Sequence, residues 1–135
     1  MDKLVFIIDD DKVYLDFMKG HFRKMAGYQV EAYPSGDEAL VQLETKNPFL
    51  IILDHHLNDA TKDGIYFLKK IRKIKSSVPT IYITSDDSAE VKKMALKNGA
   101  KNLILKSESF LVQLRTAIDD IITPKKASIF SKIFN

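Results

Sequence analysis

The sequence predicts an α/β fold of five strand–helix units, (βα)5, arranged as a doubly wound sandwich. Short apolar runs alternate with stretches in which apolar residues recur about every 3.6 positions, as they do along one face of a helix. Four of the five runs are apolar nearly throughout, which is typical of parallel strands that helices cover on both faces. Because crossovers between parallel strands are right-handed, helices are expected on both sides of the sheet. The expected strands are residues 4–8, 28–33, 49–53, 80–84 and 102–105.

The first helix follows residues 4–8 and shows a stripe of mostly large apolar side chains. Gly27 is a suitable stop signal after it, since glycine readily adopts the backbone conformation that ends a helix. Residues 28–33 then alternate between apolar and polar side chains, which predicts a strand at an edge of the sheet. The stripe consists of Val13, Phe17, Met18, His21, Phe22 and Met25.

Cap and stop signals indicate the remaining helices. The second helix opens at a capping box, Ser35 with Glu38, and the Asn-Pro pair at 47–48 closes it. Three further apolar stripes predict the third, fourth and fifth helices, and a proline or glycine follows each of them. These stripes are Ile65, Leu68 and Ile71; then Val91, Ala95 and Leu96; and then Leu111, Leu114, Ile118 and Ile121.

Length and composition limit the class of protein. A chain of 135 residues, 45% hydrophobic and 29% charged, is expected to fold as one domain, residues 1–123, followed by a tail, residues 124–135. The absence of cysteine excludes disulfides, thiolate zinc sites and cysteine nucleophiles, and it suits a cytoplasmic setting. No signal peptide is recognised and no apolar run approaches the ~20 residues of a membrane helix, so no membrane partner is expected. The net charge of +3 is too small and too mixed to indicate a nucleic-acid partner.

Chemically reactive side chains follow four of the five expected strands. In open α/β sheets, ligands bind at the carboxyl ends of the strands, where the strand order reverses. Residues at these ends are therefore the candidates for a functional site. They are Asp9, Asp10 and Asp11 after the first strand, Asp54, His55 and His56 after the third, Thr84, Ser85 and Asp86 at and after the end of the fourth, and Lys106 and Ser107 after the fifth.

The carboxylates of Asp9, Asp10 and Asp54 are expected to meet in one cleft, while Asp11 is expected to cap the first helix. Two like charges ~4 Å apart repel by roughly 4 kcal/mol at an effective dielectric constant near 20, so the cluster needs a counter-ion or a raised pKa. Lys106 supplies a single positive charge. A hard divalent cation, Mg²⁺ or Mn²⁺, suits the remaining oxygen ligands better than zinc does.

Carboxylates, a divalent cation, a lysine and a hydroxyl together indicate phosphoryl chemistry. Asp54 can attack a phosphoryl group and hold it as an acyl phosphate. Lys106 would offset charge on the phosphoryl oxygens, and Thr84 could donate a hydrogen bond to one of them. A bound phosphate adds about 1.5 to 2 negative charges, which is enough to draw Thr84 and its loop inward as a switch.

In this order, the residues resemble a response-regulator receiver domain of two-component signalling. The resemblance covers about residues 3–122 and includes Asp63-Gly64 before the third helix. It implies a flavodoxin-like three-layer sandwich with a five-stranded parallel sheet in the order 2-1-3-4-5. The resemblance further implies the site roles: Asp54 as phosphoacceptor, Asp9, Asp10, Asp54 and the backbone carbonyl of His56 as Mg²⁺ ligands, Thr84 as the switch hydroxyl, and Lys106 as the cation that senses phosphate.

The same resemblance implies the partners. Family members take phosphate from a phosphohistidine on a histidine kinase or phosphotransfer protein and lose it by hydrolysis. The chain is therefore expected to catalyse only its own phosphorylation and dephosphorylation, as a stand-alone monomer or a phosphorylation-linked dimer without a DNA-binding domain. In the family, the surface of the fourth helix, fifth strand and fifth helix transmits the signal. Lysines 92, 93, 97 and 101 make part of this surface basic, and an ordinary solvated surface is their simplest interpretation.

Four features depart from the family's pattern. The loop between Asp54 and Gly64 is about two residues longer than usual and lacks the usual proline. Leu103 stands where an aromatic switch residue is common, so coupled flipping of a ring is not expected. Ser107 stands where proline is common, and the peptide bond before it is expected to be trans, or a strained cis bond if the loop demands it. His56 occupies a position that influences dephosphorylation in the family, and we expect its ring near the path of the attacking water.

Three other interpretations remain open from the sequence alone. A receiver-like module could signal by protein contact without phosphorylation, using the long loop or the tail, whose apolar residues 129–130 and 133–134 form an amphipathic stripe or stay disordered. A phosphohydrolase would need a second acid two residues after the nucleophile, where His56 stands. A zinc site at His55 and His56 is disfavoured, because neighbouring side chains of an extended segment point to opposite faces.

Overall fold

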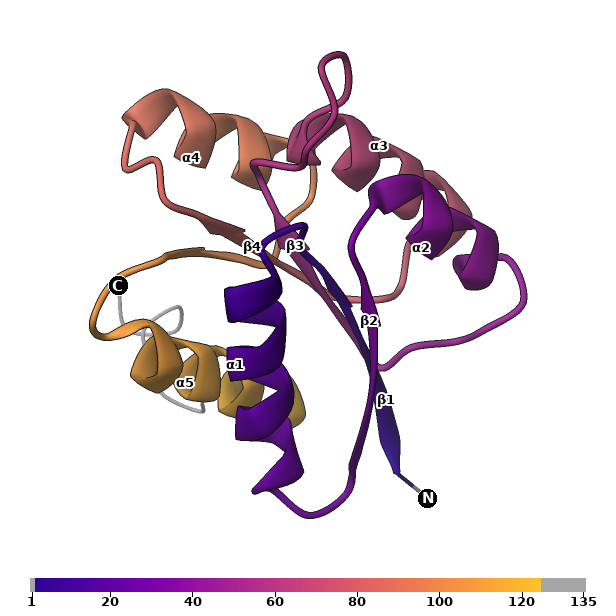
Figure 1. Ribbon diagram of the computed structural model, residues 1–135, viewed down its shortest axis with the longest axis vertical. Coiled ribbons are helices and arrows are strands. Elements are labelled where there is room, and N and C mark those ends of the chain that lie inside the picture. Colours follow the sequence, from indigo (N-terminus) through magenta and orange to yellow (C-terminus); the bar gives the residue numbers. More distant parts are fainter. Residues whose placement is uncertain (1, 125–135) are drawn as a thin grey trace, which may run out of the picture.

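Five parallel strands form the sheet, as the apolar runs predicted. The computed structural model describes residues 2–124. The strands lie in the order β2-β1-β3-β4-β5 (Figure 1), which confirms the predicted topology. Their bounds are β1 Lys3–Ile8, β2 Tyr28–Tyr33, β3 Leu50–Asp54, β4 Thr80–Thr84 and β5 Asn102–Leu105.

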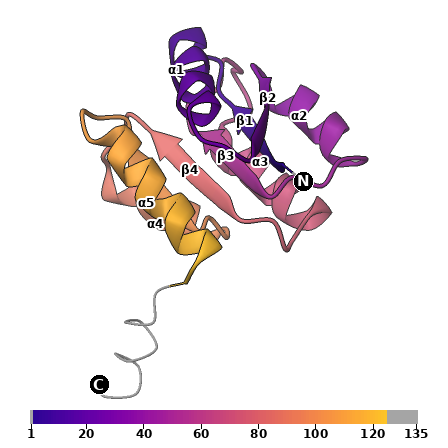
Figure 2. The same ribbon diagram turned by 90° about the horizontal axis from the view of Figure 1, so that it is seen from below.

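Helices cover both faces of this sheet and complete three layers (Figures 1 and 2). One face carries α1 (Lys12–Arg23) and α5 (Phe110–Ile122), and the other carries α2 (Gly36–Leu43), α3 (Gly64–Ile74) and α4 (Ala89–Lys97). Because successive side chains of a strand point to opposite faces, each central strand contributes to two cores. In β1, for example, Val5 and Ile7 pack under α1 and α5, whereas Phe6 and Ile8 pack under the other three helices.

The third strand begins and ends one residue later than the sequence predicted. It spans Leu50–Asp54 in place of residues 49–53, and Asp54 pairs in register with Ile83 of β4. His55 N then donates a hydrogen bond to Ile83 O over 2.8 Å. Asp54 is therefore the last residue of the strand, and the sheet itself fixes its backbone.

The stripe predicted for the first helix is wrong for two of its residues. Met18 and Phe22 of α1 are buried, but Val13 and Phe17 are 75% and 51% exposed. Each residue of a helix is rotated by about 100° from the previous one, so Val13 and Phe17 lie roughly 100–140° away from Met18. The helix packs against the sheet along a narrower arc than the apolar pattern covers. In α4 the same reason leaves Leu96 exposed beside the buried Ala95.

The predicted caps of α1 and α2 are present, and Asp63 caps α3 as well. Asp11 accepts a hydrogen bond from Val13 N at 2.9 Å at the start of α1. Ser35 Oγ accepts one from Glu38 N at 3.2 Å at the start of α2. Asp63 Oδ1 accepts one from Tyr66 N at 3.0 Å at the start of α3. Each side chain satisfies a backbone N–H that lacks a partner within its helix.

β2 lies at an edge of the sheet, as its alternating pattern predicted. Within residues 2–124, no helix has both the length and the apolar character needed to cross a membrane. The tail predicted at residues 124–135, including its apolar positions, lies outside the described residues beyond Pro124.

Candidate functional site

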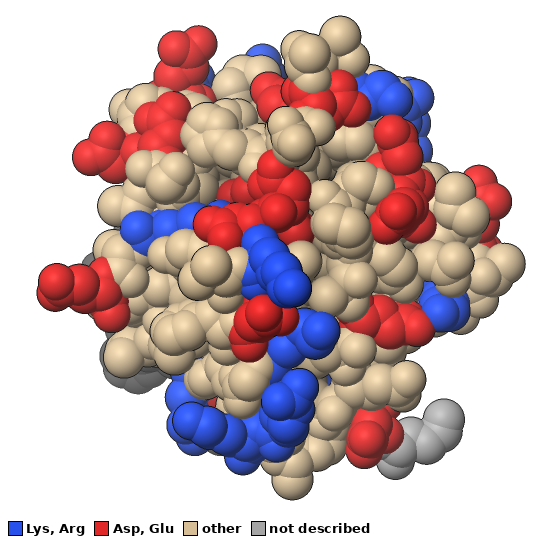
Figure 3. Space-filling model, in the orientation of Figure 1, with Lys and Arg blue, Asp and Glu red and all other residues tan. Residues whose placement is uncertain are grey.

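Three aspartates meet at the carboxyl end of the sheet. Asp9 directly follows β1 and Asp54 ends β3, and these neighbouring strands flank the point where the strand order reverses. Asp9, Asp10 and Asp54 each offer a carboxylate oxygen, and these oxygens lie within 4.8 Å of one another. Figure 3 shows acidic side chains gathered near the middle of this face of the molecule. The structure thus brings together the three acids that the sequence predicted to meet.

Lys106 reaches the cluster from the end of β5. Its Nζ lies 2.9 Å from Asp9 Oδ2 and 3.3 Å from Asp54 Oδ1. The strands β3 and β4 separate β5 from β1, so a long side chain is needed to cross this edge of the sheet. Lys106 N also donates a hydrogen bond to Thr84 O over 2.7 Å, which anchors the backbone from which the side chain extends.

Burial raises the pKa of both buried acids of the cluster. Burial raises the pKa of Asp54, and the nearby charge of Asp9 raises it further against the effect of Lys106, to about 7. Burial likewise raises the pKa of Asp9, although its Oδ1 accepts a hydrogen bond from Asp11 N at 2.9 Å. Burial alone would lower the pKa of Lys106, but the hydrogen bond to Asp9 and the charge of Asp54 outweigh it and the pKa is raised. The lysine therefore stays protonated.

The donor atoms of this cluster fit a hard divalent cation. Apart from the Lys106 ammonium, no hydrogen-bond donor within residues 2–124 reaches the buried atoms Asp9 Oδ2 and Asp54 Oδ1. Three ionised carboxylates against one ammonium leave two negative charges uncompensated. Carboxylate oxygens without sulfur or imidazole are the ligand set that Mg²⁺ and Mn²⁺ prefer.

Thr84 ends β4 at the same edge of the sheet and is fully buried. Its Oγ1 accepts a hydrogen bond from Asp86 N at 2.9 Å, which leaves the hydroxyl proton for a second acceptor. In the part of the chain that the structure describes, no hydrogen bond joins this hydroxyl to the acidic cluster. The switch role of Thr84 stays a prediction.

The expectation that His55 and His56 point to opposite faces is wrong. The chain leaves the extended conformation after Asp54, and the two ring centroids lie 4.7 Å apart. His55 Nδ1 lies 2.6 Å from the hydroxyl of the buried Tyr82, and burial together with the charge of His56 lowers the pKa of His55. His56 is exposed. Among residues 2–124 neither histidine joins a cluster of metal-binding size, and the predicted roles of the His56 ring and carbonyl stay predictions.

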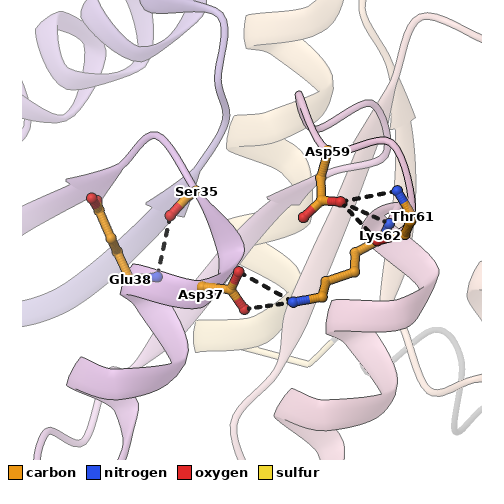
Figure 4. A network of polar contacts seen from close by, with 6 residues as sticks. All are labelled: Ser35, Asp37, Glu38, Asp59, Thr61 and Lys62. Carbon is orange, nitrogen blue, oxygen red and sulfur yellow. Dashed lines mark hydrogen bonds and ion pairs between the residues drawn. The ribbon is translucent and has the colours of Figure 1, made fainter.

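Hydrogen bonds within the long loop after Asp54 and an ion pair to α2 hold this loop in place (Figure 4). Asp59 Oδ1 accepts hydrogen bonds from Thr61 N at 2.9 Å and from Lys62 N at 3.2 Å, which folds this segment into an Asx turn. Lys62 Nζ in turn lies 3.4 Å from Asp37 Oδ2 in the first turn of α2. The loop rises as a projection from the site edge of the sheet in Figure 1.

Ser107 and Leu103 stand where the sequence departs from the pattern of receiver domains. The described residues contain no cis peptide bond, so the bond between Lys106 and Ser107 is trans, as predicted. Leu103 is partly buried and packs against the core under α2, α3 and α4.

Sequence reasoning missed Tyr14. The centroid of its ring lies 4.2 Å from Lys106 Nζ, so this side chain from α1 contacts the cation of the cluster. Tyr14 stands four residues after Asp10, about one helical turn beyond the acidic strand end. An aromatic residue in the first turn after such a strand end is the signal that could have indicated it.

The chain matches the family model of the response regulator receiver domain over residues 5–119. Among curated proteins, it is 31% identical to the alkaline phosphatase synthesis transcriptional regulatory protein PhoP of Bacillus subtilis over 106 residues, which are 78% of this chain and 43% of that protein. It is 32% identical to the probable C4-dicarboxylate response regulator DctR of the same organism over 116 residues, 85% of this chain and 50% of that protein. The chain thus spans half or less of the length of these relatives.

Solved receiver structures are similar along most of the chain. A CheY-like response regulator receiver domain protein from Methanospirillum hungatei aligns with a TM-score of 0.78 and 28% identity, covering 90% of this chain and 94% of that one. The receiver domain of the Francisella response regulator 1452 aligns with a TM-score of 0.78 and 29% identity, covering 92% and 100%. The strand order and the helix layers described above are thus shared with receiver domains.

Proposed function

Since the chain belongs to the response regulator receiver domain family, we propose that Asp54 accepts a phosphoryl group from a histidine kinase or a phosphotransfer protein. One observation carries this proposal: at the strand ends, a buried carboxylate lies 3.3 Å from a lysine ammonium and next to two further carboxylates. A buried nucleophile, a fixed cation and acidic ligands for a metal ion are the parts that phosphoryl transfer to a carboxylate requires.

In the proposed reaction, an ionised Asp54 oxygen attacks the phosphorus of a phosphohistidine. The new O–P bond forms as the N–P bond breaks, and the departing imidazole takes a proton from solvent. Because its pKa is raised to about 7, Asp54 in the metal-free chain is ionised in only part of the molecules at neutral pH. The Lys106 ammonium, already at the cluster, stabilises negative charge on the phosphoryl oxygens.

The proposed Mg²⁺ ligands are the carboxylates of Asp9, Asp10 and Asp54 and the backbone carbonyl of His56. When bound, Mg²⁺, or Mn²⁺ in its place, would offset charge on the transferring group. Among the described residues, Lys106 alone donates to the two buried oxygens Asp9 Oδ2 and Asp54 Oδ1, which supports this assignment.

Phosphorylation is proposed to act as a switch on a protein-interaction surface. The added charge would draw the Lys106 ammonium and the free proton of the Thr84 hydroxyl toward the phosphoryl oxygens. Thr84 leads into the loop before α4, where Asp86 N binds its Oγ1, so a movement of Thr84 would reach α4. Lys92, Lys93 and Lys97 of α4 are exposed, and a docking role for this basic surface stays a prediction.

The proposed reaction is tested with acetyl phosphate as the donor and intact-mass spectrometry as the measurement. With Mg²⁺, the chain is expected to gain the mass of one phosphoryl group, and with EDTA in place of Mg²⁺ it is expected to gain none. Borohydride reduction of the acyl phosphate should then convert Asp54 to homoserine, which peptide mapping locates. A chain that takes no phosphate from acetyl phosphate, phosphoramidate or a histidine kinase would instead be a phosphorylation-independent interaction module.

Replacing Asp10 with asparagine is expected to weaken Mg²⁺ binding by about 10- to 100-fold. A hydrogen bond or ligand contact to a charged group contributes about 1.5–3 kcal/mol, and about 1.4 kcal/mol corresponds to a factor of ten. Isothermal titration calorimetry with MgCl₂ measures the affinity.

The neighbouring Asp11→Asn variant is the matched control for this measurement. Asp11 caps α1 and is not one of the three clustered acids, and asparagine caps a helix about as well as aspartate does. Its Mg²⁺ affinity should stay within about twofold of the original chain. Equal affinities of the Asp10→Asn and Asp11→Asn variants would exclude Asp10 from the metal site.

A cytoplasmic location, the monomer or phosphorylation-linked dimer, and action without a DNA-binding domain stay predictions. The relative named as a transcriptional regulatory protein is more than twice the length that the match covers.

A further inference from the structure

Within residues 2–124, three side chains approach the Lys106 ammonium, and one of them carries no charge. It lies 2.9 Å from Asp9 Oδ2, 3.3 Å from Asp54 Oδ1 and 4.2 Å from the centroid of the Tyr14 ring. The face of an aromatic ring attracts a cation electrostatically within about 6 Å of its centroid. The Tyr14 ring therefore contacts the ammonium on a third side, beside the carboxylates of Asp9 and Asp54.

The Tyr14 ring is itself fixed in place. It meets the ring of Phe110, the first residue of α5, edge-on at 5.5 Å and 89°, and it meets the ring of Phe17 at 6.3 Å. Phe110 is 2% exposed, so it anchors Tyr14 to the core under α1 and α5. Lysine has a flexible stem of four carbons, and a rigid neighbour reduces the positions that its head can occupy.

The two carboxylates cannot hold Lys106 equally well throughout the proposed reaction. Asp54 gives one oxygen to the O–P bond and loses its negative charge to the phosphoryl group, and Asp9 is a proposed ligand of Mg²⁺. The ring of Tyr14 takes part in neither change. It can thus keep the ammonium beside residue 54 before and after the transfer.

We propose that Tyr14 is a positioning residue that holds the Lys106 ammonium at the phosphoacceptor through its ring face. This inference rests on the proposed function of Asp54, and it adds a residue of α1 to the site. Loss of the ring should slow phosphorylation through the placement of Lys106 and leave the fold intact.

Two substitutions separate the ring face from the hydroxyl. Tyr14→Phe keeps the ring, and Tyr14→Leu replaces it with an aliphatic side chain that still packs on Phe110. Tyr14 lines a surface hollow of about 340 Å³, together with Phe17 and Phe110, so its truncation widens a hollow at the surface and leaves the core filled. Both variants are therefore expected to fold, which circular dichroism and thermal melting check.

Phosphorylation by acetyl phosphate is then followed over time at subsaturating and saturating donor. Tyr14→Phe should react within about twofold of the original chain, and Tyr14→Leu should react about 3- to 10-fold more slowly at saturating donor. In a Lys106→Met background, Tyr14→Leu should cause no further loss, because the ring acts only through the lysine. The matched control is Tyr66→Leu, which removes an α3 ring lying 5.5–5.6 Å from Lys62 and Lys70 and should leave the rate unchanged.

The placement of Lys106 is read independently by NMR of the lysine side chain. The ring current of Tyr14 should shift the Hε and Nζ signals of Lys106 in the original chain and in Tyr14→Phe, and Tyr14→Leu should lose the shift. If the chain takes no phosphate but Tyr14→Leu removes the ring-current shift of the Lys106 signals, the proposed function is wrong and the contact between the Tyr14 ring and Lys106 is upheld. The inference is overturned, and the proposed function kept, if the chain is phosphorylated but Tyr14→Leu reacts as fast as the original chain. The same holds if Tyr14→Leu slows phosphorylation by the same factor in the Lys106→Met background.

Discussion

Replacing Asp54 with asparagine is expected to abolish phosphorylation and, in the metal-free chain at pH 8, to raise the free energy of unfolding. The first effect follows because an amide oxygen does not attack the phosphoryl donor as a carboxylate does. The second follows from the charges of the site. With Asp54 neutral, Lys106 faces Asp9 alone at 2.9 Å, and the repulsion between two buried carboxylates disappears.

The direction of the pH dependence follows from the raised pKa. The pKa of Asp54 is 3.8 in an ordinary environment and about 7 in the folded chain, so between these values the folded state binds more protons than the unfolded state. The stability contributed by this group therefore falls as pH rises from about 4 to 7, and the full penalty is present above 7. Asp54→Asn removes the penalty. The increase in the free energy of unfolding that Asp54→Asn causes should be absent near pH 3.8 and complete at pH 8.

The expected increase in the free energy of unfolding at pH 8 is on the order of 1–3 kcal/mol, since one pKa unit corresponds to about 1.4 kcal/mol and the buried asparagine amide keeps a cost of its own. Urea denaturation at pH 5, 6, 7 and 8 in EDTA measures it. Adding Mg²⁺ should stabilise the original chain more than the Asp54→Asn variant and so narrow the difference.

Asp16→Asn serves as the control, because Asp16 is an exposed acid of α1. It should remain phosphorylated and show no pH-dependent gain. An Asp54→Asn variant that is equally stable relative to the original chain at pH 5 and pH 8 would contradict the electrostatic account of the site.

Replacing Gly64 with alanine is the second change with a large expected effect. A Cβ at this position would collide with the Tyr82 hydroxyl and would lie 2.5 Å from the Asp54 backbone oxygen and 2.7 Å from His55 Cα. Two of these contacts are backbone atoms of the strand end that carries Asp54, and they cannot rotate away. Relief of the collision must therefore move α3 or the end of β3.

The free energy of unfolding is expected to fall by about 2–3 kcal/mol, the cost of overpacking a well-filled site. The better helix propensity of alanine offsets less than about 1 kcal/mol of this. Phosphorylation should slow as well, because the backbone of Asp54 is displaced. Urea denaturation and the acetyl phosphate assay measure the two effects.

Gly20→Ala is a closely matched control within the same chain. Gly20 also lies in a helix, α1, but a Cβ there would meet no atom within 4 Å. This variant should gain about 0.5–1 kcal/mol of stability and keep its phosphorylation rate. If the two alanine variants had equal stability, the close packing of Gly64 against the strand end would be refuted.

The helix faces and loop geometry show where prediction from the sequence failed. The periodic pattern placed Val13 and Phe17 in the buried stripe of the first helix, yet both are largely exposed. A pattern records which residues are apolar, whereas the arc that is buried depends on how α1 packs against the sheet. The same holds for His55 and His56, which lie ring against ring because the chain turns after Asp54.

The sequence by itself determined the five strand–helix units and the identity of the reactive side chains at the strand ends. These follow from local periodicity and from cap and stop residues, which are short-range properties, whereas the order of the strands was implied by the resemblance to receiver domains. Only the tertiary structure decided that Lys106 bridges Asp9 and Asp54, that Tyr14 faces this lysine and that the pKa of Asp54 is raised to about 7. These features depend on distances and burial across strands that are far apart in the chain, which only the packed sheet and helices fix.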